Sequence, residues 1–201
     1  QQGLMVYNLK GELLQSLPAG RVNNVDVRQG FSHRGRPIDI AAASQRDRHA
    51  ISLFAIDPAT GTVTTAEEIE TGLTDVYGLC MYQQASEVYV FINDQDGRFE
   101  QWQIKDSPQG WRGQLRRRFS VQSQPEGCAA DDQQQRLFIG EEDVAVWTLD
   151  AAPDAPTAMQ QVAAVGDWLV ADIEGMDIYR RGDQAWLVVS SQGNDSYVVF
   201  N

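Results

Sequence analysis

The sequence contains an internal repeat of about 49 residues, and this repeat limits the possible folds more than any other feature. The segments VYGLCMY, PEGCAAD and IEGMDIY are built around Gly78, Gly127 and Gly175, which lie 49 and 48 residues apart. A repeat of about 40 to 50 residues that contains about four short strands is typical of a β-propeller blade. The sequence therefore predicts one supersecondary unit that is copied several times along the chain.

Two further patterns follow the same repeat. Short apolar runs end at intervals of 49, 48 and 50 residues, at Ser44, Asn93, Glu141 and Ser191. Aromatic residues stand near the ends of β-rich runs, at Tyr7, Phe54, Trp102, Trp147 and Phe200. Since no segment shows sustained helical periodicity, we expect an all-β propeller of four-stranded blades.

The register of the aromatic pattern indicates how the blades divide the chain. Tyr7 corresponds to Phe54, and Phe200 corresponds to Trp147, so the sequence starts and stops partway through a blade. We therefore expect residues 1–201 to form one propeller domain that is incomplete at both ends, with four repeat lengths and part of a fifth. Because open blade edges carry unpaired backbone groups, we also expect them to associate with another copy or another domain.

The composition limits the partners. The chain carries a formal net charge of -12, and 42% of its residues are hydrophobic. An acidic chain argues against nucleic acid as a partner, because phosphate-backbone binding depends on Lys and Arg. No apolar run reaches the roughly 20 residues that a membrane-spanning helix requires, so no membrane partner is expected. A small anionic ligand stays compatible with this charge, provided that local basic residues or bound cations offset it.

The two cysteines occupy positions that are one residue out of phase within the repeat. Cys80 follows its repeated glycine by two residues, whereas Cys128 follows its glycine by one. Because side chains alternate faces along a strand, the two sulfur atoms should lie on opposite faces of their strands. We therefore expect two buried free thiols, with a disulfide as the less favoured alternative.

The residue before each repeated glycine is polar in every copy. These residues are Tyr77, Glu126 and Glu174, and the matching place in the first unit lies near Asn24. Since the innermost strands of a propeller line its channel, these side chains should converge at one end of it. Converging carboxylates need cations, and an oxygen-rich cluster without His or Cys favours calcium over zinc. The alternative is that blade ends are polar only because they are solvated.

Longer motifs along the whole chain resemble those of the β-propeller phytases. They include GLMVYNLKGELL, VNNVDVR, DIAAASQR, DVYGL, GRFEQW, SQPEGCAADD, LFIGEEDVAVW, DIEGMDIY and SSQGNDSY. The resemblance implies a six-bladed propeller with calcium ions in its channel. It also implies a phosphatase that acts on myo-inositol hexakisphosphate (phytate) and that is secreted or periplasmic in bacteria.

The resemblance further implies roles for individual residues. The implied calcium ligands are Glu126, Glu174, Asp172, Glu142, Asn23 and Val25. The implied catalytic set is Glu126, Glu174, Arg46 and Tyr77, of which Arg46 and Tyr77 contact the substrate phosphate. The substrate-binding set is completed by Glu142 and by Gln95 and Asp96, which stand where the family has a Lys–Glu pair. Gln1 and Gln2 stand where the family carries a pair of lysines.

The implied reaction is the release of phosphate from phytate by direct attack of a metal-activated water, with Arg46 and Tyr77 holding the phosphate. The main alternative is a non-catalytic propeller module that binds calcium–phytate or a partner domain, which the changed lysine positions favour. A propeller hydrolase of another kind, such as a calcium lactonase, shares the metal but not these motifs. We expect little phytase activity from residues 1–201 alone, because the family's first and last calcium-binding segments lie outside them.

Overall fold

The computed structural model describes residues 3–201, so Gln1 and Gln2 lie outside the described residues. Within this range the chain forms β-strands and one short 3-10 helix, η1 (Gln192–Asn194). The strands are β1 (Leu4–Tyr7), β2 (Leu13–Leu17), β3 (Val22–His33), β4 (Arg36–Gln45), β5 (Ala50–Ile56), β6 (Val63–Glu70), β7 (Val76–Gln84), β8 (Glu87–Asp94), β9 (Arg98–Lys105), β10 (Arg112–Ser120), β11 (Pro125–Asp131), β12 (Arg136–Glu141), β13 (Ala145–Asp150), β14 (Gln160–Ala164), β15 (Met176–Arg181), β16 (Gln184–Ser191) and β17 (Ser196–Phe200). None of the described residues belongs to a helix that is long and apolar enough to cross a membrane.

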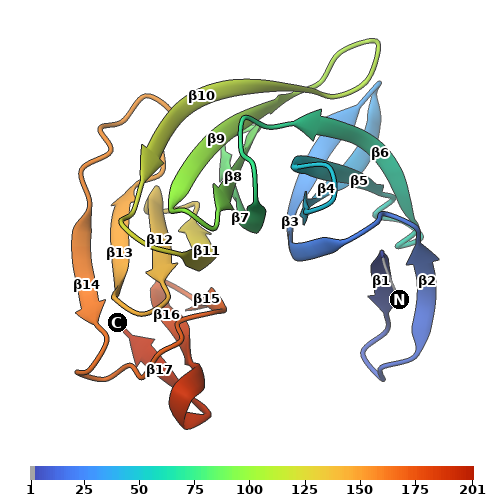
Figure 1. Cartoon of the computed structure of the whole chain (residues 1–201). Helices are drawn as coiled ribbons and strands as arrows, with labels where there is room; N and C mark the ends of the chain where they lie inside the picture. Colours follow the sequence, from blue (N-terminus) through green and yellow to red (C-terminus); the bar gives the residue numbers. More distant parts are fainter. Residues whose placement is uncertain (1–2) are drawn as a thin grey trace.

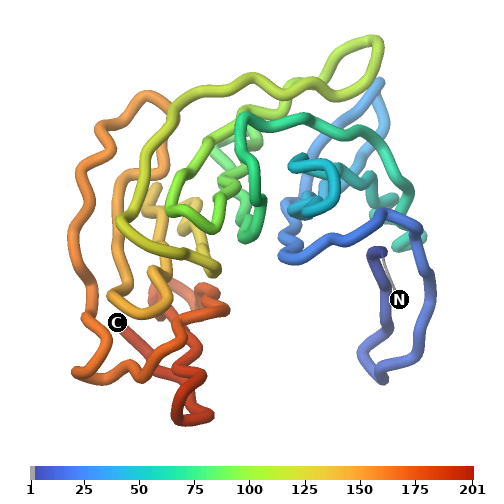
Figure 2. The backbone as a smooth tube through the Cα atoms, in the orientation of Figure 1, coloured from blue at the N-terminus to red at the C-terminus, as the bar shows by residue number. Residues whose placement is uncertain are grey.

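The strands form antiparallel sheets in strict chain order (Figure 1). The sheets β3–β6, β7–β10 and β11–β14 have four strands each, while β1–β2 has two and β15–β17 has three. The sheets follow one another around an arc as blades, with the two partial blades at its ends. Figure 2 shows the two termini across the open side of this arc. The predicted all-β propeller of four-stranded blades is confirmed.

Each blade repeats the same order of strands from the inside of the arc outward. The first strands, β3, β7, β11 and β15, lie on the inner side, and the fourth strands, β6, β10 and β14, lie on the outside (Figure 1). The aromatic pattern falls on the third strand of every blade, with Phe54 on β5, Trp102 on β9 and Trp147 on β13. Tyr7 on β1 and Phe200 on β17 take the same place, as the register of the sequence predicts.

Apolar side chains between neighbouring blades form the core. Leu53 and Ile92 belong to the cluster between the β3–β6 and β7–β10 blades. Phe91 and Leu137 belong to the cluster between the β7–β10 and β11–β14 blades. Successive residues of one strand thus face different neighbouring blades. Full burial of each such side chain contributes about 1.5 to 3 kcal/mol, so inter-blade packing holds the arc together.

Two of the three repeated glycines, Gly78 and Gly127, lie where neighbouring inner strands approach each other closely. A Cβ atom on Gly78 would stand 1.9 Å from the carbonyl oxygen of Glu126, and one on Gly127 would stand 1.7 Å from that of Glu174. No atom of the described residues lies within 4 Å of the corresponding point on Gly175. The 49-residue spacing of glycines in the sequence therefore records a repeated blade-to-blade contact.

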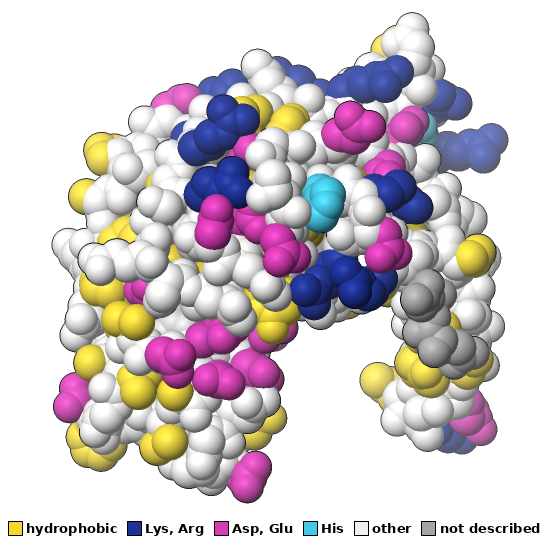
Figure 3. All heavy atoms as spheres, viewed as in Figure 1, with side chains coloured by type: hydrophobic (Ala, Val, Ile, Leu, Met, Phe, Trp, Pro, Cys, Tyr) yellow, Lys and Arg dark blue, Asp and Glu magenta, His cyan; other side chains and the backbone are white. Residues whose placement is uncertain are grey.

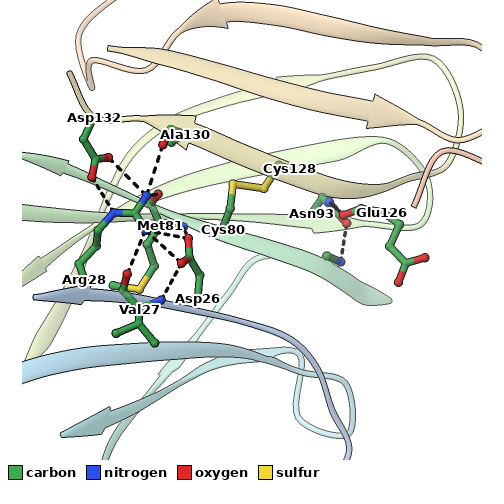
Figure 4. The surroundings of a disulfide bond; sticks show 11 residues. Asp26, Val27, Arg28, Cys80, Met81, Asn93, Glu126, Cys128, Ala130 and Asp132 are labelled. Carbon is green, nitrogen blue, oxygen red and sulfur yellow. Dashed lines mark hydrogen bonds and ion pairs between the residues drawn. A yellow bond between two sulfur atoms is a disulfide. The ribbon is translucent and has the colours of Figure 1, made fainter. Parts of the chain in front are cut away.

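Cys80 and Cys128 form a disulfide whose Cα atoms are 5.6 Å apart (Figure 4), so the prediction of free thiols is wrong. The two side chains do point to opposite faces of their blades. In a propeller, however, opposite faces of neighbouring blades pack against each other. Cys80 on β7 faces the next blade and Cys128 on β11 faces the previous one, within the same buried cluster. The phase difference that seemed to separate the sulfur atoms brings them together.

The inner strands share an irregularity that the sequence did not reveal. In three of them the register of pairing with the second strand shifts near the start, as in a β-bulge, so the intervening residues leave the regular ladder. The shifts fall between Val22 and Val25, between Val76 and Leu79, and between Pro125 and Cys128. Asn23, Tyr77 and Glu126, three of the residues predicted for the site, lie inside these shifts.

Candidate functional site

Most predicted site residues gather at one end of the inner strands. This end combines the starts of β3, β7 and β11 with the ends of β4, β8 and β12, which antiparallel pairing places side by side. Asn23, Tyr77 and Glu126 lie on the first strands, and Arg46 and Glu142 directly follow second strands. Figure 3 shows acidic side chains gathered on the inner side of the arc near β11 and β15, opposite a basic group near β3.

Glu126 is the centre of this cluster. The hydroxyl of Tyr77 donates to Glu126 Oε2 over 3.0 Å, and the amide of Asn23 donates to Glu126 Oε1 over 3.2 Å. The same Asn23 amide lies 3.4 Å from the carbonyl oxygen of Tyr77. Three consecutive blades therefore meet at one carboxylate, as the repeat predicts for Tyr77 and Glu126.

The phenol of Tyr77 is held in its protonated form. Burial raises the pKa of Tyr77 to about 12, and the hydrogen bond to Glu126 and the charge of Glu126 act in the same direction. The positive charge of Arg46 opposes them. At neutral pH Tyr77 therefore serves as a hydrogen-bond donor, whose hydroxyl is available either to Glu126 or to a bound anion.

Arg46 covers the ring of Tyr77. Its guanidinium carbon lies 4.9 Å from the ring centroid, which is within range of a cation–π contact. Its Nη2 lies 3.9 Å from Asp75 Oδ1. In the orientation that satisfies both of its partners, the Gln95 amide accepts from Arg46 Nη2 over 3.1 Å and donates to Asp75 Oδ2 over 3.0 Å. The buried Nε of Arg46 has no hydrogen-bond partner among the described residues, so one donor stays available.

Glu142 lies on the acidic side of the site. The amide of Gln124 donates to both of its carboxylate oxygens, over 2.8 and 2.9 Å. Burial nevertheless raises the pKa of Glu142, and the negative charges of Asp172, Glu126 and Asp143 raise it further. Carboxylates from neighbouring blades thus repel one another at this end of the channel.

The other predicted ligands lie at the same end or along the channel. Glu174 lies two residues before the start of β15 and is half-buried, with its carbonyl oxygen against Gly127. No side-chain hydrogen bond of Glu174 or Asp172 appears within residues 3–201. Val25 lines the central channel cavity, whose volume is about 180 Å³. The structure brings Glu126, Tyr77, Asn23 and Glu142 into one cluster. Glu174, Asp172 and Val25 lie at the border of this cluster.

Several acidic residues near the predicted site have other partners. Asp96 lies in the turn between β8 and β9, where Arg98 Nε binds its Oδ2 over 2.7 Å. Asp131 and Asp132, which adjoin the repeat motif in sequence, lie at the opposite end of β11. Asp131 pairs there with Arg180 over 2.5 Å, and Asp132 lies near Arg28. A substrate role for Asp96 stays a prediction.

Sequence reasoning missed residues that support the site. Ser44 donates to the carbonyl oxygen of Tyr77 over 2.7 Å. Asn93 accepts from the amide of Gly78 over 2.8 Å and donates to the carbonyl oxygen of Glu126 over 3.3 Å. Both end apolar runs of the repeat, so their spacing was a usable signal. Their role in joining blades was not visible without the fold.

The donor set fits a calcium ion in its chemistry. In the described part of the chain, no three His, Cys, Asp or Glu side chains lie close enough together to hold a metal ion by themselves. Calcium also takes amide, carbonyl and water oxygens, and carboxylate and amide oxygens are the groups present here. The raised pKa of Glu142 reflects burial and carboxylates that lack a countercharge. A complete ligand shell requires further oxygens from backbone, water or substrate.

The fold and the site together define a class: a β-propeller protein whose inner strands bring carboxylates, a tyrosine and an arginine to one end of the channel. The phytase family model matches residues 1–201. The chain is also 40% identical over 211 aligned residues to the 3-phytase of Bacillus subtilis (strain 168). The match covers all of this chain and 55% of that relative, so the chain spans about half the relative's length. This chain belongs to the phytase family, as its motifs indicate.

Proposed function

We propose that the site at Glu126 binds and hydrolyses phosphate monoesters of phytate with the help of calcium. The observation that carries this proposal is the Tyr77–Glu126 pair beneath Arg46, in a chain of the phytase family. The name of the Bacillus relative, 3-phytase, supports phytate as the substrate. Since that relative is about twice as long as the matched region, both activity and substrate are proposals for this chain.

The chain's own residues supply binding and orientation in this proposal. The guanidinium of Arg46 has a fixed planar fork that suits phosphate oxygens, and its unpartnered Nε gives it a spare donor. The Tyr77 hydroxyl, kept protonated, donates to a second oxygen of the same phosphate. Asp75 and Gln95 both contact Nη2 of Arg46, and these contacts keep the guanidinium over the Tyr77 ring.

Calcium is the proposed cofactor, and its proposed ligands are the residues that the family resemblance implies: Glu126, Glu174, Glu142, Asp172, Asn23 and Val25. When bound there, calcium would offset the charge of a polyphosphate and lower the pKa of a bound water. Glu126 orients the side chains of Tyr77 and Asn23, because its carboxylate accepts a hydrogen bond from each of them and so joins three blades. Burial and, after it, the negative charges of neighbouring carboxylates raise the pKa of Glu142, and those charges support a cation at this end.

We also propose that the protein works outside the cytoplasm, secreted or in the periplasm. The Cys80–Cys128 disulfide supports this, because disulfides persist in oxidising compartments. The proposed partner is a further propeller blade, from a second phytase domain or another copy. Tyr179, Tyr197 and Val199 support it, since they expose 58%, 73% and 57% of their surface on the last blade.

The alternative function is a non-catalytic module that binds calcium–phytate without turnover. It is favoured by the scarcity of clustered acidic ligands within the described residues. Phosphate release from phytate and from p-nitrophenyl phosphate, with calcium or with a chelator, separates the two. The proposed function predicts calcium-dependent release once the proposed further blades are present, and little release from residues 1–201 alone. Calcium-dependent binding of phytate without release of phosphate supports the non-catalytic module. If phytate is neither bound nor hydrolysed, both proposed functions are wrong.

A further inference from the structure

The residues at the centre of the site are not held by their own sheets. Tyr77 lies within the register shift between Val76 and Leu79, and Glu126 lies within the shift between Pro125 and Cys128. Neither residue therefore has a regular ladder partner on the second strand of its blade. Their positions depend on contacts between blades, such as the bond from Asn93 to the Glu126 carbonyl oxygen.

The disulfide joins the two inner strands just beyond these shifts, at the second regular ladder position of β7 and the first of β11. Cys80 pairs in the ladder with Phe91, three residues beyond Tyr77, and Cys128 pairs with Ile139, two residues beyond Glu126. β7 and β11 belong to different sheets and share no hydrogen-bonded ladder. Figure 4 shows the disulfide crossing between them, with Glu126 on one side of it and Arg28 on the other.

A second fastening lies at the far end of the same strands. Arg28 on β3 donates to the carbonyl oxygen of Met81 and binds Asp132 Oδ2 over 2.8 Å. The backbone amide of Gln83 also donates to Asp132, over 2.9 Å. These contacts tie the blades together on the side away from Glu126. Nearer to the site, the disulfide is the covalent link between β7, which carries Tyr77, and β11, which carries Glu126.

We propose that the Cys80–Cys128 disulfide is a positioning element of the candidate site, fixing Tyr77 against Glu126 and so keeping the phosphate-binding geometry. The proposal rests on the proposed function for its phosphate readout. Cleavage leaves the apolar packing between blades in place but removes the constraint next to the two shifted segments. The site then loosens while the propeller stays folded.

The disulfide is within reach of a small reductant from the channel. Both cysteines line the channel cavity, although they expose only 2% and 7% of their surface. Dithiothreitol supplies two electrons and two protons, which convert the S–S bond into two thiols, and it closes into its own cyclic disulfide. Re-oxidation restores the bond, so the effect should be reversible.

The test compares the oxidised protein with the dithiothreitol-treated protein and with the Cys80→Ser/Cys128→Ser variant, well below their melting temperatures. Hydrogen exchange should quicken in segments 74–79 and 122–127 and stay unchanged in β3–β6. The affinity for inorganic phosphate, measured by calorimetry with calcium, should fall about tenfold. Unchanged exchange in the two segments, or uniform acceleration across all blades, overturns the proposal.

Arg28→Met provides the matched control, because it removes the fastening at the far end without touching the site. It should lower the melting temperature and leave the affinity for phosphate unchanged. An equal loss of affinity in Arg28→Met would assign the effect to general stability and overturn the positioning role. If the oxidised protein binds no phosphate, the proposed function fails, and the hydrogen exchange still decides whether the disulfide positions Tyr77 and Glu126.

Discussion

The carbonyl oxygen of Glu174 occupies the place where a Cβ atom of Gly127 would stand, at 1.7 Å from that point. The same contact recurs one blade earlier between Glu126 and Gly78, at 1.9 Å. Gly78 and Gly127 thus allow the neighbouring inner strand, with its acidic residue, to approach the channel end. The same close approach of inner strands therefore sets both the packing of neighbouring blades and the spacing between the acidic residues of the site.

Alanine substitutions at the repeated glycines should have unequal effects. Gly127→Ala forces two backbones apart and should lower the free energy of unfolding by about 3 kcal/mol. Gly175→Ala meets no atom of the described residues within 4 Å and should change it by less than about 0.5 kcal/mol. Urea denaturation of both variants measures the difference. Equal losses would mean that the close approach is not what selects glycine.

Removal of the Tyr77 hydroxyl should reveal its raised pKa in the alkaline range. A folded-state pKa of about 12, above the ordinary value of 10, means that the phenol stabilises the fold below pH 10. This contribution is lost as the pH rises from about 10 to about 12. Tyr77→Phe should therefore show a smaller loss of stability across this window, measured by chemical denaturation at several pH values. An unchanged pH profile contradicts the assignment.

Glu142→Gln should separate the cost of like charges from the benefit of calcium. The raised pKa of Glu142 means that its stabilising contribution is present at low pH and is lost as the carboxyl ionises. At neutral pH without metal, the neutral amide should therefore raise the melting temperature slightly. Calcium should raise the melting temperature of this variant less than that of the unmodified chain. A larger calcium effect in Glu142→Gln would exclude Glu142 as a ligand.

Arg46 should matter far more for phosphate than for folding. Arg46→Ala should weaken the binding of inorganic phosphate by about 10- to 100-fold, since a preorganised donor to the anion is lost. Arg46→Lys should restore only part of it, because an ammonium cannot bind two oxygens through a planar fork. Calorimetric titration and thermal melts of both variants provide the comparison. If Arg46→Ala keeps full affinity for phosphate, Arg46 does not bind the anion and only packs over the ring of Tyr77.

The repeat allowed much of the fold and part of the site to be predicted. Because equivalent positions of a repeat converge, Tyr77 and Glu126 could be paired from their spacing alone, and their hydroxyl and carboxylate lie 3.0 Å apart. The disulfide was missed because alternation was applied within single strands and not between facing blades. Asn93 was not recognised as a support because the periodic spacing marks its position in the repeat but not the neighbouring blade that its side chain contacts.

The most direct test of the proposed site is phosphate release from phytate by the unmodified chain and by Glu126→Gln, each joined to the proposed further blades and each assayed with calcium and with a chelator. The amide preserves the shape and an acceptor for Tyr77, but it removes the charge at the point where three blades meet. The account predicts release only from the unmodified chain with calcium, with loss of release in Glu126→Gln. Release that persists in the chelator, or that is equal in the two proteins, would contradict it.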